Sequence, residues 1–346
     1  MSALERGVSI VICTYNGKKN LAPTLEHIAA QKNIASIPVE LLIVDNASTD
    51  NTTAFAEEKW KTLNSPIPLR IIQEPQSGKA YASRKGFNAA KHEFILVCDD
   101  DNWLCDSYVQ NAYEIMTANP SIGVLGGTGI PVFEKQKPEW FDKYEVVFAV
   151  GKQGGGSGDV TDKVNALWGA GMVFRKEAWN KLNELNYRFF LNAQRTGKTN
   201  WGGDDSELCE MIRMLGYRIW VEDALTFKHY MPQNRMTAAY IKSRFYGLGR
   251  SRLYLQAYIY CRKYNTLPGQ QLKYALWLDK WLHKTKDYLL QLPKYIFYKA
   301  EKLDDDHLKF IALKGEISEL WRIKNKYTDV FTYILEMQKK VHLLKK

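Results

Sequence analysis

The sequence predicts an α/β fold in which an open, mostly parallel, doubly wound sheet carries helices on both faces. Two observations support this prediction. Short apolar runs alternate with helical patterns through the first hundred residues, and polar residues stand where those runs end. Strand–helix–strand repetition is typical of right-handed crossovers, which build Rossmann-like sheets. In such sheets ligands bind outside the carboxyl ends of the strands.

The four expected strands are nearly all apolar and do not alternate with polar residues, which is the pattern of strands buried on both faces. They cover residues 8–13, 39–44, 69–72 and 94–98. The segments between them have helical spacing. These expected helices cover residues 21–30, 52–63 and 79–90.

The middle of the chain is less regular. Its glycine-rich segments indicate loops, over residues 126–131 and 151–158. Further on, we expect a strand over 167–174, a helix over 206–215, and two short strands over 217–222 and 225–229.

Charge divides the chain of 346 residues into two parts. Residues 228–346 hold 24 basic and 10 acidic residues, a balance of +14, whereas residues 1–227 have a balance of −4. We therefore expect two parts with different partners, over residues 1–235 and over 236–346, of which the second is helical and basic. Such a basic region suits an anionic membrane surface, a diphosphate or a nucleic acid, although no recognised nucleic-acid motif is present.

The basic region contains an apolar stripe at helical spacing, with lysines between its members. The stripe consists of Trp277, Leu278, Trp281, Leu282, Tyr288 and Leu289. One interpretation is peripheral contact with a bilayer. The alternative is packing on residues 1–235, or on another subunit of an oligomer.

The five cysteines include no CxxC pair, and no run reaches the roughly 18 apolar residues that a spanning helix needs. The amino-terminal residues also lack the pattern of a signal peptide. These features predict a cytoplasmic protein, at the inner face of the plasma membrane if the basic region binds lipid.

Three adjacent carboxylates, Asp99, Asp100 and Asp101, directly follow the apolar run FILVC. They repel one another unless they are solvated or neutralised. Mg²⁺ or Mn²⁺ binds a few carboxylates together with substrate phosphates and waters. Because alternate residues at a strand end point the same way, Asp99 and Asp101 are candidate ligands, and His229 offers a nitrogen. The alternatives are a solvated acidic turn and a structural histidine.

Two further segments lie where a nucleotide would be bound. Asp45 ends the second apolar run, so its carboxylate is a candidate acceptor for a base or ribose. Gly78 and Lys79 open the third helix and Arg84 follows, a combination that holds anions at a helix start. The spacing of a P-loop is absent.

Paired acids, Asp204 and Asp205, stand after two glycines at the expected start of a helix. They are either first-turn acids, which the helix dipole stabilises, or part of a site in which one of them is a general base. About thirty residues earlier, small residues allow a sugar to approach the backbone. This segment is Trp168, Gly169, Ala170 and Gly171; its alternative interpretation is a tight turn.

Taken in order, these segments resemble the family 2 glycosyltransferases of the GT-A fold. The matching stretches are VSIVICTYNG, ELLIVDNASTDNT, GKAYASRKGFNAA, FILVCDDDNWL, WGAGMVFRKEAW and GGDDSELCEMIRMLGYRI. The resemblance covers residues 8 to about 230. It implies inverting transfer of a sugar from a nucleoside diphosphate, with Mn²⁺ or Mg²⁺ as cofactor.

The resemblance also implies roles for single residues. Thr14, Tyr15 and Asp45 would line the nucleoside pocket, and Lys79 and Arg84 would lie near the base or phosphates. Asp99 and Asp101 would be the metal-binding acids of the DxD motif, Asp100 would lie nearer the ribose, and His229 would touch the metal or the diphosphate. Asp205 would be the catalytic base. Asp204 replaces the family's usual Glu, which keeps the charge but shortens the reach.

The expected reaction is transfer from a UDP-linked sugar to a hydroxyl of a glycan or lipid-linked glycan in bacterial surface polysaccharide synthesis. One alternative is a nucleotidyltransferase that makes the sugar nucleotide. That class normally has a glycine-rich basic loop after the first strand, where this chain has Thr14-Tyr15-Asn16-Gly17. The other alternative is a membrane or nucleic-acid binding module without catalysis.

Overall fold

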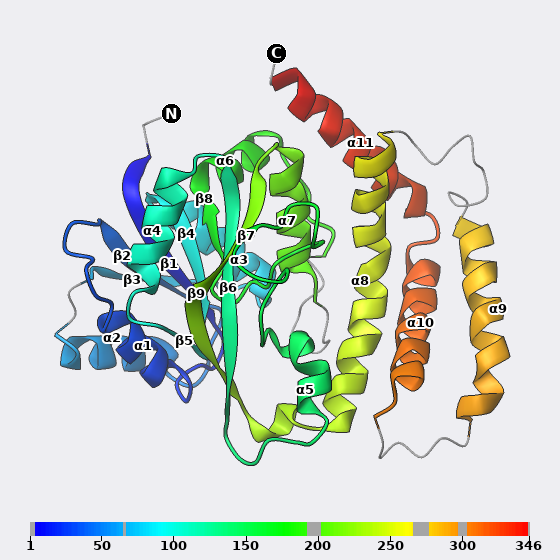
Figure 1. The fold of residues 1–346 in the computed structure, drawn as a ribbon, viewed down its shortest axis with the longest axis horizontal. Coiled ribbons are helices and arrows are strands. Elements are labelled where there is room, and N and C mark those ends of the chain that lie inside the picture. Colours follow the sequence, from blue (N-terminus) through cyan, green and yellow to red (C-terminus); the bar gives the residue numbers. More distant parts are fainter. Residues whose placement is uncertain (1–3, 65–66, 192–201, 266–276, 297–302, 345–346) are drawn as a thin grey trace.

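A nine-stranded mixed sheet forms the centre of the computed structural model (Figure 1). The structure describes residues 4–344 apart from 65–66, 192–201, 266–276 and 297–302. The strands are β1 (Glu5–Thr14), β2 (Val39–Asp45), β3 (Leu69–Gln73), β4 (His92–Asp99), β5 (Asn102–Leu104), β6 (Ile122–Phe133), β7 (Gly158–Asp159), β8 (Val173–Arg175) and β9 (Arg218–Met231). Their order is β3-β2-β1-β4-β8-β6-β9-β5, and β7 pairs with β9.

The sheet is mostly parallel, as the sequence predicts. β1 is parallel to β2 and β4, β2 to β3, and β6 to β9. Antiparallel pairs join β8 to β4 and β6, and β9 to β5 and β7. The four strands expected in the first hundred residues are β1 to β4.

Helices cover both faces of this sheet. The helices in the described part of the chain are α1 (Leu21–Ala29), α2 (Thr52–Thr62), α3 (Lys79–Ala89), α4 (Tyr108–Ala118), α5 (Phe141–Tyr144), α6 (Lys176–Glu184), α7 (Asp204–Met214), α8 (Ala238–Tyr264), α9 (Trp277–Tyr295), α10 (Asp305–Arg322) and α11 (Tyr327–Leu344). The 3-10 turns η1 (Glu145–Phe148) and η3 (Gln233–Arg235) follow α5 and β9.

The side chains of β1 show how the layers form. Ile10 and Ile12 pack in one core with Leu25 of α1 and Trp60 of α2. The alternate residue Val11 packs in the other core, which also holds residues of α3, α6 and α7. Because a strand presents alternate residues to opposite faces, one strand contributes to both cores. This doubly wound arrangement confirms the predicted fold class.

Residues 126–131 were expected to be a loop, and that prediction was wrong, because they belong to β6. A Cβ atom on Gly127 would lie 2.0 Å from the carbonyl oxygen of Leu225, and one on Gly129 would lie 2.1 Å from that of Ala149. Glycine therefore allows neighbouring backbone to approach β6 closely. These glycines are therefore explained by close backbone packing around the strand and do not indicate a turn.

Two other expected elements also differ. The short strands expected over 217–222 and 225–229 are halves of one strand, β9, on either side of a register shift between Val221 and Thr226. The strand expected over 167–174 begins only at Val173 in β8, and a turn occupies most of the segment.

The carboxyl-terminal helices pack on the core with α3, α6 and α7, so they share a core with the sheet. Tyr258 of α8 and Phe331 of α11 lie in the same buried cluster as Val11. α8 and α10 cross closely at small residues, since a Cβ on Gly249 would lie 1.9 Å from the Ala312 carbonyl oxygen. α9 is the outermost of these helices (Figure 1). None of the helices in the described part of the chain is both long and apolar enough to cross a membrane.

Candidate active site

Polar side chains gather at the carboxyl ends of β1, β2 and β4. Strand register brings them there, because Thr14 lies opposite Asp45 and Cys13 lies opposite Asp99. Parallel pairing therefore places the ends of three strands at one edge of the sheet. This is the edge at which open α/β sheets bind ligands.

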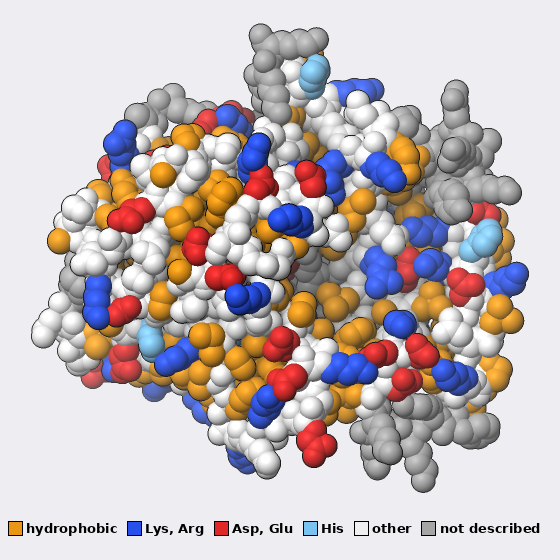
Figure 2. All heavy atoms as spheres, viewed as in Figure 1, with side chains coloured by type: hydrophobic (Ala, Val, Ile, Leu, Met, Phe, Trp, Pro, Cys, Tyr) orange, Lys and Arg blue, Asp and Glu red, His pale blue; other side chains and the backbone are white. Residues whose placement is uncertain are grey.

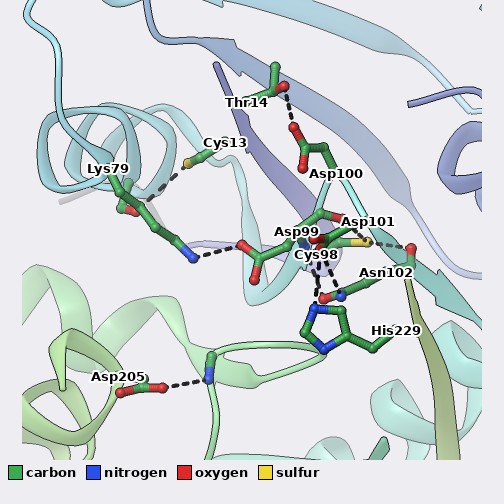
Figure 3. Close-up of polar contacts among 12 residues, drawn as sticks. Cys13, Thr14, Lys79, Cys98, Asp99, Asp100, Asp101, Asn102, Asp205 and His229 are labelled. Atoms are coloured by element: carbon green, nitrogen blue, oxygen red, sulfur yellow. Dashed lines mark hydrogen bonds and ion pairs between the residues drawn. The ribbon is translucent and has the colours of Figure 1, made fainter. Parts of the chain in front are cut away.

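Each of the three adjacent acids has different partners, of which Figure 3 labels Lys79, Thr14 and His229. The Lys79 ammonium donates to Asp99 Oδ1 at 2.7 Å. The Thr14 hydroxyl donates to Asp100 Oδ2 at 2.6 Å. Arg235 donates from Nη1 to Asp101 Oδ2 at 2.9 Å. Cationic side chains from separate elements thus offset the charges of Asp99 and Asp101, whereas the partner of Asp100 is a neutral hydroxyl.

Burial and neighbouring charges shift the pKa values of two of these acids in opposite directions. Burial, with the charges of Asp101 and Asp99, raises the pKa of Asp100 to about 7. Burial would also raise the pKa of Asp101, but the positive charges of His229 and Arg235 outweigh it and hold that pKa well below its usual value. Asp101 therefore stays ionised, while Asp100 exchanges a proton near neutral pH.

The pairing of β5 with β9 brings His229 to the acids. In this antiparallel pair His229 lies opposite Asn102, and His229 Nε2 lies 3.5 Å from Asp101 Oδ1. Arg235 follows on η3, after the end of β9. Sequence reasoning missed Arg235 as a site residue. Its only signal was its place shortly after the strand that ends near His229, and no motif marks that position.

Asp205 stands in the first turn of α7, where the helix dipole favours a carboxylate. Its Oδ1 accepts from the Ser206 amide at 2.7 Å and its Oδ2 from the Gly169 amide at 3.0 Å. Burial and the charge of Asp204 raise the pKa of Asp205, against these hydrogen bonds and the charge of Lys79. A raised pKa makes this carboxylate a better proton acceptor.

The segment expected to approach a sugar is the turn that holds Asp205. The Trp168 amide donates to Oε1 of the buried Gln153 at 2.8 Å. Gly171 has a φ of +69°, and Tyr108 donates to its carbonyl at 2.6 Å. Ala170 is buried. The segment is therefore a tight turn, as the alternative interpretation predicts, and its backbone contacts the candidate base; the approach of a sugar to it stays a prediction.

The remaining predicted residues differ in how closely they join this group. Tyr15 is exposed at the end of β1. Asp45 accepts from the Ser48 amide at 3.0 Å and the Thr53 hydroxyl at 2.6 Å; burial would raise its pKa, but these hydrogen bonds outweigh burial and lower it. Asp204 is half-buried beside Asp205. Arg84 is exposed on α3, and among the residues that the structure describes it contacts none of the site acids.

The donor atoms available to a metal ion are carboxylate oxygens and an imidazole. Within the described ranges, no group of three or more His, Cys, Asp or Glu side chains is gathered as a metal site. Two carboxylates, Asp99 and Asp101, nevertheless lie at the sheet edge, and the buried Nδ1 of His229 has no hydrogen-bond partner. Mg²⁺ and Mn²⁺ fit such an incomplete set, because they take further ligands from phosphates and water.

Comparison of the sequence with known families matches residues 9–182 to the model described as glycosyl transferase family 2. A glucosyl-dolichyl phosphate glucuronosyltransferase from Haloferax volcanii is 22% identical over 71% of this chain and 76% of its own length. The glycosyltransferase GlyG from Streptococcus pneumoniae is 30% identical, but over 34% of this chain and 38% of its own.

Solved structures share the fold. The mannosyltransferase PcManGT from Pyrobaculum calidifontis, in complex with GDP-Man and Mn²⁺, superposes with a TM-score of 0.54 at 18% identity, over 99% of this chain and 90% of that one. TarS from Staphylococcus aureus gives a TM-score of 0.50 at 13% identity, over 92% of this chain and 55% of that one. At such identities these likenesses establish a GT-A fold and nothing finer.

Proposed function

The chain belongs to glycosyl transferase family 2, and from this premise we propose that it transfers a sugar, with inversion, from a nucleoside diphosphate to an acceptor hydroxyl. The observation that carries the proposal is the position of Lys79. Its ammonium contacts Asp99, and its charge lowers the pKa of Asp205. The turn over residues 168–171 also connects the two groups of acids, because its Gly169 amide donates to Asp205 and the Val97 amide of β4 donates to the neighbouring Met172 carbonyl.

Asp205 is the proposed general base. As the acceptor oxygen bonds to the anomeric carbon, its proton passes to the Asp205 carboxylate. The bond from that carbon to the diphosphate oxygen breaks on the opposite face, so an α-linked donor gives a β-linked product. The carbon acquires oxocarbenium character in such substitutions. General base catalysis typically contributes about 10²–10⁴-fold.

Asp99, Asp101 and His229 are the proposed residues for Mn²⁺ or Mg²⁺. A cation bridging the diphosphate would stabilise the negative charge that develops on the leaving group. The low pKa of Asp101 supports this role, because the carboxylate is ionised at neutral pH. The two carboxylates supply the hard oxygen ligands that these cations prefer.

The other site residues have proposed binding roles. For the nucleoside and phosphates these residues are Thr14, Tyr15, Asp45, Lys79, Arg84, Asp99 and Asp100. For the sugar and acceptor they are Trp168, Gly169, Ala170, Gly171 and Asp204. Contact between the Gly169 amide and Asp205 supports the second group, because the sugar pocket must adjoin the base.

We propose a UDP-linked donor and a glycan or lipid-linked glycan acceptor in bacterial surface polysaccharide synthesis. The archaeal relative supports a lipid-linked acceptor, since its name specifies glucosyl-dolichyl phosphate. TarS, named as a poly(ribitol-phosphate) β-N-acetylglucosaminyltransferase, supports a surface polymer. Membership of this family does not support either alternative function, that of a nucleotidyltransferase or that of a non-catalytic binding module.

A panel of nucleotide sugars tests the donor. UDP-linked and GDP-linked sugars are added with Mn²⁺ or Mg²⁺, and the melting temperature is followed. A donor at about 100 times its dissociation constant adds about 2.7 kcal/mol of stability. Release of nucleoside diphosphate with a lipid-linked acceptor then identifies the reaction. Stabilisation by no sugar nucleotide, together with no release, would contradict the proposal.

We propose that residues 1–235 carry the chemistry and that 236–346 support it at the inner face of the membrane. Trp277 and Trp281 of α9 are half-buried and stack on each other beside Trp321 of α10, which is itself exposed. Leucines of α9 remain exposed, namely Leu278, Leu282, Leu289 and Leu290. Figure 2 shows hydrophobic side chains beside lysine and arginine in this region. Leucine, tryptophan and lysine together suit an anionic bilayer surface.

Vesicle co-sedimentation of the full-length protein tests this contact. Truncation before α8 is unsuitable, because Tyr258 and Phe331 belong to the shared core. Leu278, Leu282 and Leu289 are therefore changed together to Gln. Binding to vesicles of anionic phospholipid should fall in the variant, and equal binding of both proteins would exclude the leucines as the contact.

A further inference from the structure

Both carboxylate oxygens of Asp101 already face a cationic or potentially cationic side chain. Oδ2 accepts from Arg235 Nη1 at 2.9 Å, and Oδ1 lies 3.5 Å from His229 Nε2. The Asp101 side chain is only 6% exposed, so water replaces these partners poorly. A metal ion that binds Asp101 must therefore compete with Arg235 for one carboxylate.

Three features of Arg235 would allow its side chain to move away from the Asp101 carboxylate. Its side chain is 37% exposed, against 6% for Asp101, so it reaches the acid from the solvent side. It belongs to the short turn η3, which begins after Pro232. A guanidinium carries five N–H donors, more than one carboxylate oxygen can accept, and its planar fork matches phosphate oxygens.

Lys79 occupies the corresponding position on Asp99, but its surroundings differ. Its ammonium contacts Asp99 and its charge acts on Asp205 as well. Moving Lys79 would therefore affect two acids of the site. Moving Arg235 onto a nearby anion would expose Asp101 to an incoming cation, remove a positive charge that also acts on Asp100, and keep the contact of Lys79 with Asp99.

We propose that Arg235 and the catalytic cation share Asp101. Arg235 neutralises Asp101 in the donor-free protein, and passes to the diphosphate oxygens when cation and nucleoside diphosphate bind together. The inference rests on the proposed function. It makes Arg235 a donor-binding residue that stabilises the departing diphosphate.

The sharing has a thermodynamic consequence. A cation alone must displace Arg235, and two positive groups then lie close together without a counter-ion. A diphosphate supplies that counter-ion to both. Each ligand should therefore strengthen binding of the other by the same factor, because coupling between sites is reciprocal.

The test measures Mn²⁺ binding to the full-length protein by electron paramagnetic resonance, alone and with saturating UDP, and in parallel with GDP. In the wild-type protein we expect the better nucleotide to strengthen Mn²⁺ binding by roughly 5–150-fold, the usual range of coupling. Arg235→Gln should bind Mn²⁺ alone several-fold more tightly and should lose most of the coupling.

Two further variants separate this exchange from a general charge effect. Arg252→Gln removes an exposed arginine from α8 and should leave both affinities unchanged. Arg235→Lys keeps the charge that opposes Mn²⁺ but lacks the planar fork, so it should retain weak binding of Mn²⁺ alone and lose nucleotide affinity. Melting curves confirm that each variant is folded.

Two outcomes would overturn the inference. If wild type and Arg235→Gln have the same Mn²⁺ affinity and the same coupling between Mn²⁺ and nucleotide, Arg235 does not share Asp101 with the cation. The assignment of the cation site would remain. Absence of Mn²⁺ binding in both proteins, with either nucleotide, would overturn the cation assignment together with the inference. Transfer that persists with a chelator would still support the proposed reaction in that case.

Discussion

The Nζ atom of Lys79 lies 2.7 Å from Oδ1 of Asp99. Its positive charge also lowers the pKa of Asp205, which otherwise is raised by burial and by Asp204. One ammonium therefore connects the acids that follow β4 with the acid that opens α7. The 168–171 turn links the two regions through its backbone: the Gly169 amide donates to Asp205, and the Val97 amide of β4 donates to the Met172 carbonyl.

Replacement of Asp205 by Asn should abolish most of the activity. The change removes the carboxylate that accepts the acceptor proton, so kcat should fall by about 10²–10⁴-fold while donor binding is kept. Asp204→Asn is the matched control, because it removes one charge from the same helix turn. It should affect the KM of the acceptor more than kcat. Near wild-type turnover in Asp205→Asn would exclude Asp205 as the base.

The acid limb of the pH profile should depend on Lys79. Because Asp205 must be ionised to accept a proton, activity falls as pH drops through its raised pKa. Lys79 lowers that pKa, so Lys79→Gln should move the acid limb of kcat to higher pH. Lys85→Gln changes a lysine on the same helix that donates to the Gln73 carbonyl, and should leave the limb in place. An unmoved limb in Lys79→Gln would contradict the arrangement.

Metal-dependent donor binding should require Asp101. Asp101→Ala removes an ionised ligand, so the gain in nucleotide-sugar affinity on adding Mn²⁺ should shrink by at least about tenfold, or about 1.4 kcal/mol. Isothermal titration with and without Mn²⁺ measures this gain. Asp106→Ala, an exposed acid paired with Lys32, should keep the gain. The same Mn²⁺-dependent gain in Asp101→Ala would show that Asp101 holds no cation.

The sequence predicted the parallel half of the sheet well because its strands are buried on both faces. A continuous apolar run such as 39–44 has few alternatives to a central strand, and it is β2. β6 was missed because Gly127 and Gly129 serve close backbone packing, which local sequence does not distinguish from a turn. Local sequence patterns thus predict apolar strands such as β2 better than strands such as β6, in which glycines allow close backbone packing.

The candidate site divides in the same way. Asp99, Asp101 and Asp205 stand at element ends that local patterns mark. Lys79 contacts Asp99, and its charge lowers the pKa of Asp205. Arg235 has no such mark. Its contact with Asp101 depends on the pairing of β5 with β9 and on the turn after it, and long-range pairing of that kind leaves no local signal in one sequence.

Gly171 should resist substitution. Its φ of +69° disfavours any residue with a Cβ atom, and that atom would lie 2.5 Å from the hydroxyl of Tyr108. Gly171→Ala should therefore lower the free energy of unfolding by about 1–3 kcal/mol and disturb the turn that holds Asp205. Gly155→Ala is the control, since Gly155 has a φ of +86° and no atom within 4 Å of its Cβ position. If denaturant titrations show that both variants lose the same free energy of unfolding, the positive φ alone explains the loss and the contact with Tyr108 adds nothing.

Glu207 should make the protein less stable as pH rises. Burial raises its pKa from 4.5 to about 7, although its carboxylate accepts from the amides of Phe190 and Leu191 and from the hydroxyl of Tyr258. Between these two pH values the folded state binds more protons than the unfolded state. The free energy of unfolding therefore falls across this window, by on the order of 3 kcal/mol from this group.

Glu207→Gln removes this titration, so the stability difference between wild type and variant should change steadily between about pH 5 and 8. The wild type should lose stability relative to the variant as pH rises. Glu184→Gln, at an exposed position, should give a difference that is constant with pH. The comparison matters because Asp100, whose pKa is also about 7, lowers wild-type stability in the same direction and cancels only in the difference. A constant difference for Glu207→Gln would mean that this buried carboxyl group ionises normally.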